Sequence, residues 1–456
     1  DTGAISVPPS ATIANIENIN LTSTATVTAD GTSWTGAETI TVAGVGAATL
    51  TAAATTDVIA TATVMSADVT VQGAKDVTLT TTNTSTTAVS SGNSVLVGST
   101  TAAAGTVIVN HTETVTQAAN AGTVTSDVAV TGGTSVTVNS LTTLSSTTDA
   151  DDTTTTGAIS VTGKTATTDV TVTQSKMVVA AANVMGLTNA AVTITDGNTA
   201  TTVADTITTV TLGNYGASTV DSNVLSTVNL TGGTTQALAS GTLALDITAT
   251  DTSTVATTLN LNMASGFVGA ISGTQAAKYT TVNIDSAAAA TIADVTIGAA
   301  TALNVSGAGV TTLTANTGIG LVTAINSTGG GLTLGTAIGS GVTLTGGDGA
   351  ETFTVGATTK TIATGAGDDV VTVSVSALGT GGSIDAGDGT DTLVIAGADN
   401  VDTAADAARY TNFETITVAA DQDASLIAGV TAVNVAAATS ATLTKLSVAQ
   451  AGAITG

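Results

Sequence analysis

The chain has 456 residues, of which 33 are acidic and 7 basic, and its formal net charge is −26. This balance excludes nucleic-acid binding through a basic surface, and the absence of cysteine excludes disulfides and thiol chemistry. Aromatic residues make up 2% of the chain, so its 42% of hydrophobic residues are mostly aliphatic, which favours a thin, repetitive core. No run of about 18 apolar residues occurs, so no transmembrane segment is predicted.

Residues 1–344 are rich in Thr, Ala and Gly and contain short runs in which two apolar residues flank one polar residue. Such alternation predicts half-buried strands, for example at 69–71, 107–109, 170–172, 282–284 and 295–297. Several runs recur eight residues apart, as at 69 and 77 or 128 and 136, and few Asn-Gly or Asp-Gly hairpin turns separate them. We therefore predict an all-β fold, an elongated parallel β-solenoid, with an antiparallel sandwich as the alternative.

Several other local features of the sequence lead to predictions of their own. Trp34, between glycines, is predicted to plug one end of the core, and the single histidine, His111, is predicted to lie on the surface at a strand end. The acidic run 145–156 is interpreted as a solvated loop, with a calcium site formed by Asp149, Asp151 and Asp152 as the alternative. Short helical turns are predicted at 183–189 and 402–410, and residues 399–402 are a weaker candidate for capping the coils or binding an ion.

Three motifs at 346–354, 364–372 and 386–394 approximate GGxGxDxUx, the nonapeptide of calcium-binding parallel β-helices. Calcium takes six to eight oxygen ligands, and glycine allows the sharp turns that direct backbone carbonyls inward. The sixth position supplies a carboxylate, namely Glu351, Asp369 or Asp391. Two nonapeptides form one coil, so the first two carboxylates should lie on one edge, about 4.8 Å apart, where one ion can bridge them. The predicted metal ligands are Gly346, Asp348, Glu351, Gly365, Gly367, Asp368, Asp369, Gly387, Asp388 and Asp391.

Ion-free turns are the alternative to this calcium site. The half-coil at 355–363 lacks the glycines and the carboxylate, so we expect no calcium on its edge. The step from Asp369 to Asp391 is longer than the preceding one, which predicts an insertion around 379–382.

The chain resembles the RTX-type, calcium-dependent bacterial surface-layer (S-layer) proteins of the Caulobacter type. The resemblance is carried by residues 153–174, 192–197, 209–233 and 410–419, and most closely by 345–394. It departs from the usual motif at Glu351, which replaces Asp, and at Thr364 and Ala386, which replace the first Gly. We accordingly divide the chain into a β-solenoid at 1–344, an RTX-like calcium-binding β-roll at 345–398, and further solenoid strands at 399–456.

The resemblance implies a structural function. It implies export by a type I system, an extracellular location on the cell surface, several bound Ca²⁺ ions, and self-assembly into a hexagonal lattice that coats a Gram-negative bacterium. Lipopolysaccharide would be contacted through a region not recognised in this chain.

An enzymatic function is not predicted. A single histidine excludes a two-histidine metal site within one chain, and neither a G-x-S-x-G elbow nor a Walker A sequence occurs. The alternatives to an S-layer protein are a segment of a calcium-stiffened RTX adhesin and the non-catalytic portion of a type I-secreted protein.

Overall fold

The computed structural model describes most of the chain. The described residues are 3–44, 46–85, 93–116, 125–144, 153–180, 186–198, 202–231, 243–246, 255–264, 268–315, 318–373, 378–396, 401, 403–436 and 442–455. Two compact units are present, unit 1 at Asp1–Val255 and unit 2 at Ala256–Gly456. The boundaries expected near 345 and 398 both fall inside unit 2.

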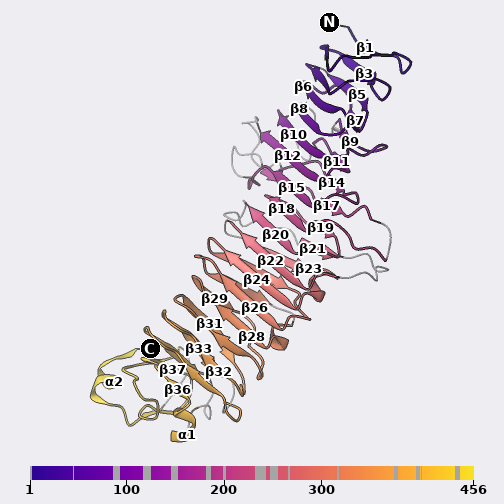
Figure 1. The fold of residues 1–456 in the computed structure, drawn as a ribbon. Helices are drawn as coiled ribbons and strands as arrows, with labels where there is room; N and C mark the ends of the chain where they lie inside the picture. Colours follow the sequence, from indigo (N-terminus) through magenta and orange to yellow (C-terminus); the bar gives the residue numbers. More distant parts are fainter. Residues whose placement is uncertain are drawn as a thin grey trace. The chain divides into compact units, whose positions relative to one another are not determined.

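Each unit is a parallel β-solenoid, in which successive strands alternate between two sheets (Figure 1). The strand ladders are in register over long stretches, for example between β10 (Thr106–Val115) and β12 (Ser135–Leu144). Pairings between the named strands of the described residues are parallel, and one isolated bridge, between Val178 and Leu187, is antiparallel. The predicted solenoid is therefore confirmed, and the antiparallel sandwich is wrong.

In unit 1, the two sheets are built as follows. Sheet 1 contains β1 (Ile5–Ser6), β3 (Thr26–Asp30), β5 (Ala47–Ala52), β7 (Val69–Gly73), β9 (Val95–Val97), β11 (Val128–Thr131), β14 (Ile159–Thr162), β17 (Val192–Thr195), β19 (Ser218–Asp221) and β21 (Leu243–Asp246). Sheet 2 contains β2 (Asn18–Thr22), β4 (Thr39–Ala43), β6 (Asp57–Ala62), β8 (Val77–Ser85), β10, β12, β15 (Asp169–Gln174), β18 (Thr209–Gly213) and β20 (Thr227–Thr231). A separate pair joins β13 (Thr153–Thr155) to β16 (Gly186–Thr188).

Unit 2 repeats this arrangement. Its sheet 1 contains β23 (Val268–Ser272), β25 (Ala290–Val295), β27 (Thr311–Ala315), β29 (Gly331–Leu334), β31 (Ala350–Val355), β33 (Val370–Val373), β35 (Thr392–Ile395), β37 (Thr415–Val418), β39 (Ala432–Val435) and β41 (Ile454–Thr455). Its sheet 2 contains β22 (Thr258–Met263), β24 (Thr281–Ser286), β26 (Ala302–Ser306), β28 (Ala324–Ser327), β30 (Thr343–Thr345), β32 (Thr361–Ala363), β34 (Ser383–Asp385) and β36 (Tyr410–Thr411). Further elements are β38 (Gln422–Asp423), β40 (Leu443–Thr444), helices α1 (Ala404–Ala407) and α2 (Val448–Gly452), and 3₁₀ turns at Ala276–Lys278 and Ile319–Leu321.

The core lies between the two sheets, because every second side chain along a strand points inward. In β24 the inward residues Val282 and Ile284 are at most 1% exposed, whereas Thr281 and Asn283 are half-buried. Small β-branched residues suit this narrow interior, which is why so few aromatic residues suffice. The eight-residue spacing seen in the sequence is the step between the two sheets of one coil, as from β7 to β8.

The other local expectations have mixed outcomes. Trp34 is buried, and its indole N–H donates to Ala11 O at 3.1 Å, as expected of a core residue. The helix at Ala404–Ala407 lies within the predicted 402–410. The strand predicted at 295–297 is wrong, because Val295 ends β25 and the next two residues form a corner.

The remaining predictions fall on or near residues outside the described ranges. The helical turn predicted at 183–189 is wrong in its described part, where Gly186–Thr188 form β16. The proposed ion ligands Asp149, Asp151 and Asp152 lie outside the described residues, as do 399, 400 and 402. Within the described part of the chain, no helix is long and apolar enough to cross a membrane.

Candidate metal centre

The three motifs form one corner of unit 2, where the chain passes from sheet 2 to sheet 1. Residues 346–349 connect β30 to β31, residues 364–369 connect β32 to β33, and residues 386–391 connect β34 to β35. The extra residues of the longer coil lie at the opposite corner, between β33 and β34, as the sequence predicted. There the Arg409 guanidinium donates to Gly382 O at 2.7 Å and to Leu378 O at 2.8 Å.

Glycines make the corner possible. Gly365, Gly367 and Gly387 have φ of 100°, 116° and 91°, in the left-handed region that other residues rarely adopt. A Cβ on Gly387 would lie 1.9 Å from Gly365 O of the preceding coil, and a Cβ on Gly346 would lie 1.7 Å from Thr364 O. The coils therefore approach so closely that only glycine fits. At the substituted first position, Thr364 is buried and its hydroxyl donates to Ala386 O at 2.7 Å.

The corner brings together the three carboxylates at the sixth motif position. Glu351, Asp369 and Asp391 are each 0% exposed and stand in register on adjacent coils. The Glu351 N–H donates to Asp369 Oδ1 at 2.7 Å, and the Asp369 N–H donates to Asp391 Oδ1 at 2.8 Å. We call this row, with the residue described next, the carboxylate ladder.

Glu414 is a fourth member of the ladder that the sequence analysis missed. It precedes β37 and is in register with Asp391, whose N–H donates to Glu414 Oε2 at 2.9 Å. The coil-length step from Asp391 to Glu414 is the signal that could have revealed it. At the other end of the ladder, the Ser327 hydroxyl donates to Glu351 Oε1 at 2.8 Å.

Half of the buried carboxylate oxygens in the ladder have no partner. Glu351 Oε2, Asp369 Oδ2 and Asp391 Oδ2 are buried without a hydrogen bond, and no ladder carboxylate forms an ion pair within the described residues. A buried carboxylate that lacks a countercharge and leaves an oxygen unsatisfied is costly. The donor set is therefore suited to a hard cation, which prefers oxygen ligands.

The electrostatics of the ladder agree with this geometry. Burial raises the pKa of Glu351 to about 7, despite the bond from Ser327, and the charge of Asp369 adds to the rise. Burial likewise raises the pKa of Asp369. The pKa of Asp391 rises to about 6, mainly through burial and partly through the charges of Asp369 and Glu414. Without a cation, burial in the folded chain thus disfavours the ionised forms of these carboxyl groups relative to the unfolded chain.

The other predicted ligands occupy different positions. Asp348, Asp368 and Asp388 are exposed on the turns, and Asp368 Oδ1 accepts a bond from Thr390 N at 2.9 Å. Within the described residues, no three carboxylate or imidazole side chains converge on one point. The ladder is a row rather than a cage, so a cation there would need backbone carbonyls of the glycine turns to complete its ligand set.

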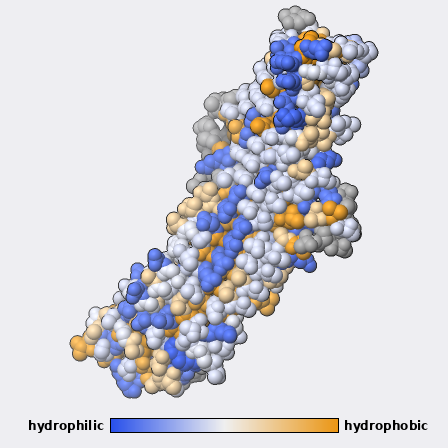
Figure 2. Space-filling model, viewed as in Figure 1, coloured by the Kyte–Doolittle hydropathy of each residue, from blue (hydrophilic) through white to orange (hydrophobic). Residues whose placement is uncertain are grey.

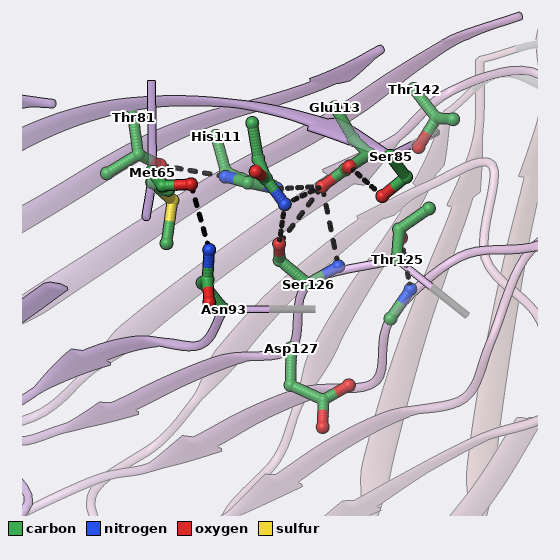
Figure 3. Close-up of polar contacts among 12 residues, drawn as sticks. Met65, Thr81, Ser85, Asn93, His111, Glu113, Thr125, Ser126, Asp127 and Thr142 are labelled. Atoms are coloured by element: carbon green, nitrogen blue, oxygen red, sulfur yellow. Dashed lines mark hydrogen bonds and ion pairs between the residues drawn. The ribbon is translucent and has the colours of Figure 1, made fainter. Parts of the chain in front are cut away.

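A second buried polar cluster lies in unit 1 and overturns the prediction for His111. His111 is 1% exposed within β10, not on the surface, because its side chain points inward. Its Nδ1 lies 2.8 Å from Thr81 Oγ1 and its Nε2 lies 3.3 Å from Glu113 Oε2 (Figure 3). The sequence predicted a surface position because His111 follows the apolar run at 107–109, but the strand continues to Val115 and its alternation places His111 on the inward side.

The Glu113 carboxylate in this cluster is fully supplied with donors. It accepts bonds from Ser85 Oγ at 2.6 Å and Ser126 Oγ at 3.0 Å (Figure 3). It also accepts a bond from Asn83 Nδ2 at 3.2 Å. Burial would raise the pKa of Glu113, but the bonds from His111, Ser85 and Ser126 outweigh it and hold the pKa below its ordinary value. The cluster therefore stabilises the core as a satisfied network, in contrast to the carboxylate ladder.

Comparison with known proteins assigns no family to the chain. No protein-family model matches it, and no curated protein matches it.

Proposed function

We propose that the carboxylate ladder binds calcium and that the protein is a structural, non-enzymatic component of a calcium-dependent S-layer. The single observation that carries the calcium proposal is the set of buried oxygens on Glu351, Asp369 and Asp391 that have no partner. Calcium bound there would supply the positive charge that the buried carboxylates lack.

Hydrogen bonds made by the ladder residues themselves would hold the coils together. Asp369, Asp391 and Glu414 each accept, through one carboxylate oxygen, the backbone N–H of the ladder residue on the preceding coil, which fixes the register between coils. The second oxygen of each of the first three carboxylates is left for a cation. With the ladder ionised and uncompensated, like charges on adjacent coils repel, so unit 2 should loosen when divalent cations are removed.

The surface-layer part of the proposal rests on the resemblance at 345–394 and on the acidic composition. A chain with net charge −26 opposes its own association unless counterions reduce the repulsion. Calcium dependence of self-assembly follows, with an extracellular location, type I secretion and contact with lipopolysaccharide outside this chain as parts of the same proposal.

The test combines calcium titration with microscopy. Purified protein is measured by isothermal calorimetry with calcium and with magnesium, then examined by negative stain with calcium and with EGTA. We expect calcium binding, ordered two-dimensional arrays with calcium, and their loss in EGTA. The S-layer proposal is wrong if particle size is the same in both conditions, and calcium binding without ordered arrays would favour the adhesin alternative.

A further inference from the structure

The two outward faces of unit 2 differ in chemistry. On sheet 2, amides form a hydrogen-bonded row: Asn283 Nδ2 donates to Asn260 Oδ1 at 2.8 Å, and Asn304 Nδ2 to Asn283 Oδ1 at 2.8 Å. Asn326 continues the row, since its Nδ2 donates to Asn304 Oδ1 at 2.7 Å. Asp285 and Asp385 are exposed on the same sheet. Figure 2 shows a row of hydrophilic residues running across the strands in this region. This face is polar and carries charge.

Between β27 and β37, the outward face of sheet 1 has neither an amide row nor a charged side chain. One row runs in unbroken register from β27 to β37, through Thr312, Thr333, Thr352, Val370, Thr392 and Thr415. A second row, two residues further along the strands, contains Thr354, Thr372, Val394 and Thr417. All ten side chains are half-buried, uncharged and β-branched. We call these two rows the Thr/Val face.

The acidic residues of these strands explain why the face is neutral. In β31 and immediately before β33 and β35, the carboxylates Glu351, Asp369 and Asp391 point inward, at 0% exposure. The outward positions are left to Thr and Val. The ten positions of the Thr/Val face therefore carry no charged side chain in a chain of net charge −26, and the exposed carboxylates of these coils, Asp348, Asp368 and Asp388, lie on the turns beside the face.

We propose that the Thr/Val face is the surface through which one copy of this chain contacts a second copy. Charged residues are depleted from the centres of protein interfaces, since desolvating a charge is costly. Like-charged copies approach with least repulsion where neither presents a carboxylate. Threonine and valine also have few rotamers to lose on burial, so ordering them at an interface costs little entropy.

The size of the face indicates what kind of contact it makes. Six strands at about 4.8 Å each span about 29 Å, and four residues along a strand span about 13 Å, which gives about 400 Å² per copy. A standard stable interface covers about 800 Å² per partner. A pairwise contact through this face is therefore weak, and we expect association that becomes appreciable only when copies make several contacts at once, as they do in an array.

This inference rests on the proposed function and identifies the surface that its self-assembly uses. The test introduces a carboxylate on the face, as Thr372→Glu in β33, and compares it with Thr361→Glu in β32, on the opposite sheet of the same coil. Thr372→Val is the conservative variant. The 456-residue chain is used, with melting temperature and calcium affinity measured first to establish that each variant folds and retains its ladder.

Sedimentation velocity over a concentration series, in calcium and in EGTA, then reports association. We expect Thr372→Glu to need at least about tenfold more protein to associate, which corresponds to about 1.4 kcal/mol, while Thr361→Glu and Thr372→Val behave as the wild type. Equal association of Thr372→Glu and wild type overturns the inference and leaves the calcium proposal standing. Association that is independent of calcium but blocked by Thr372→Glu supports the face and rejects the calcium dependence. No association of the wild type rejects both.

Discussion

Replacing Glu351 by glutamine should have opposite effects in the absence and presence of calcium. Glutamine keeps the acceptor for the Ser327 hydroxyl and replaces Oε2, the unpartnered oxygen beside the Gly346 turn, by an uncharged amide. Without divalent cations, the substitution removes a buried charge. With calcium, it removes a charged oxygen from the proposed ligand row.

The expected magnitude follows from the pKa of Glu351, which burial raises from 4.5 to about 7. At about pH 8 the ionised carboxylate is therefore disfavoured in the folded state by about 3 kcal/mol, at about 1.4 kcal/mol per pH unit. Removing it should stabilise the cation-free chain by up to that amount. For a unit of this size the melting temperature should rise by about 6–12 °C. Near pH 5 the carboxyl group is mostly neutral when folded, so the difference should shrink to below about 1 kcal/mol.

Differential scanning calorimetry in EGTA and in calcium measures both effects. We expect Glu351→Gln to melt above the wild type in EGTA at about pH 8 and to gain less than the wild type from calcium. The exposed Glu17→Gln in unit 1 is the matched control and should change neither value. A variant that melts below the wild type in EGTA, or that gains as much from calcium, would refute the assignment of Glu351 as a buried, uncompensated cation ligand.

Three further predictions follow from the same geometry. The stability of the cation-free chain, measured by urea unfolding, should fall as the pH rises from about 5 to about 7. Burial raises the pKa of Asp391 to about 6 and that of Glu351 to about 7, so the folded state binds protons that the unfolded state has lost. A rise in stability over this range would contradict the account. Glu113→Ala should destabilise unit 1 by about 3 kcal/mol and lower its melting temperature, because buried donors lose their acceptor, and it should leave calcium affinity unchanged. Since the pKa of Glu113 is lowered in the folded state, the stability that Glu113 contributes should be present at neutral pH and lost on acidification. Gly387→Ala should destabilise unit 2 by about 1–3 kcal/mol, because the φ of Gly387 is 91° and a Cβ there would lie 1.9 Å from Gly365 O. Gly356→Ala is the control, because a Cβ at Gly356 would meet nothing within 4 Å, and this variant should melt like the wild type.

The sequence alone determined the parallel solenoid and the position of the glycine corners. Alternation of Thr with Val, Ile or Leu is a local signal, since it reports directly which side of a strand each residue occupies. The motif spacing likewise placed Glu351 and Asp369 on one edge, because coils of constant length keep equivalent residues in register. The insertion before Asp391 was also predictable, since extra residues at one corner do not disturb the strand slots.

Only the tertiary structure decided which polar groups are buried and what they contact. His111 lies in the core because β10 extends beyond its apolar residues and its alternate side chains still point inward. There, Thr81 of the adjacent strand β8 and Glu113 of β10 itself provide hydrogen-bond partners. Glu414 joins the ladder because the stacking of β37 on β35 sets it beside Asp391, although no glycine motif surrounds it. The neutral Thr/Val face likewise emerges only when strands that are far apart in the chain stack in register. Alternation along the sequence determines which side of a strand each residue faces. Which residues of neighbouring coils come into contact depends on the length of every turn between them, so it cannot be read from a local stretch of sequence.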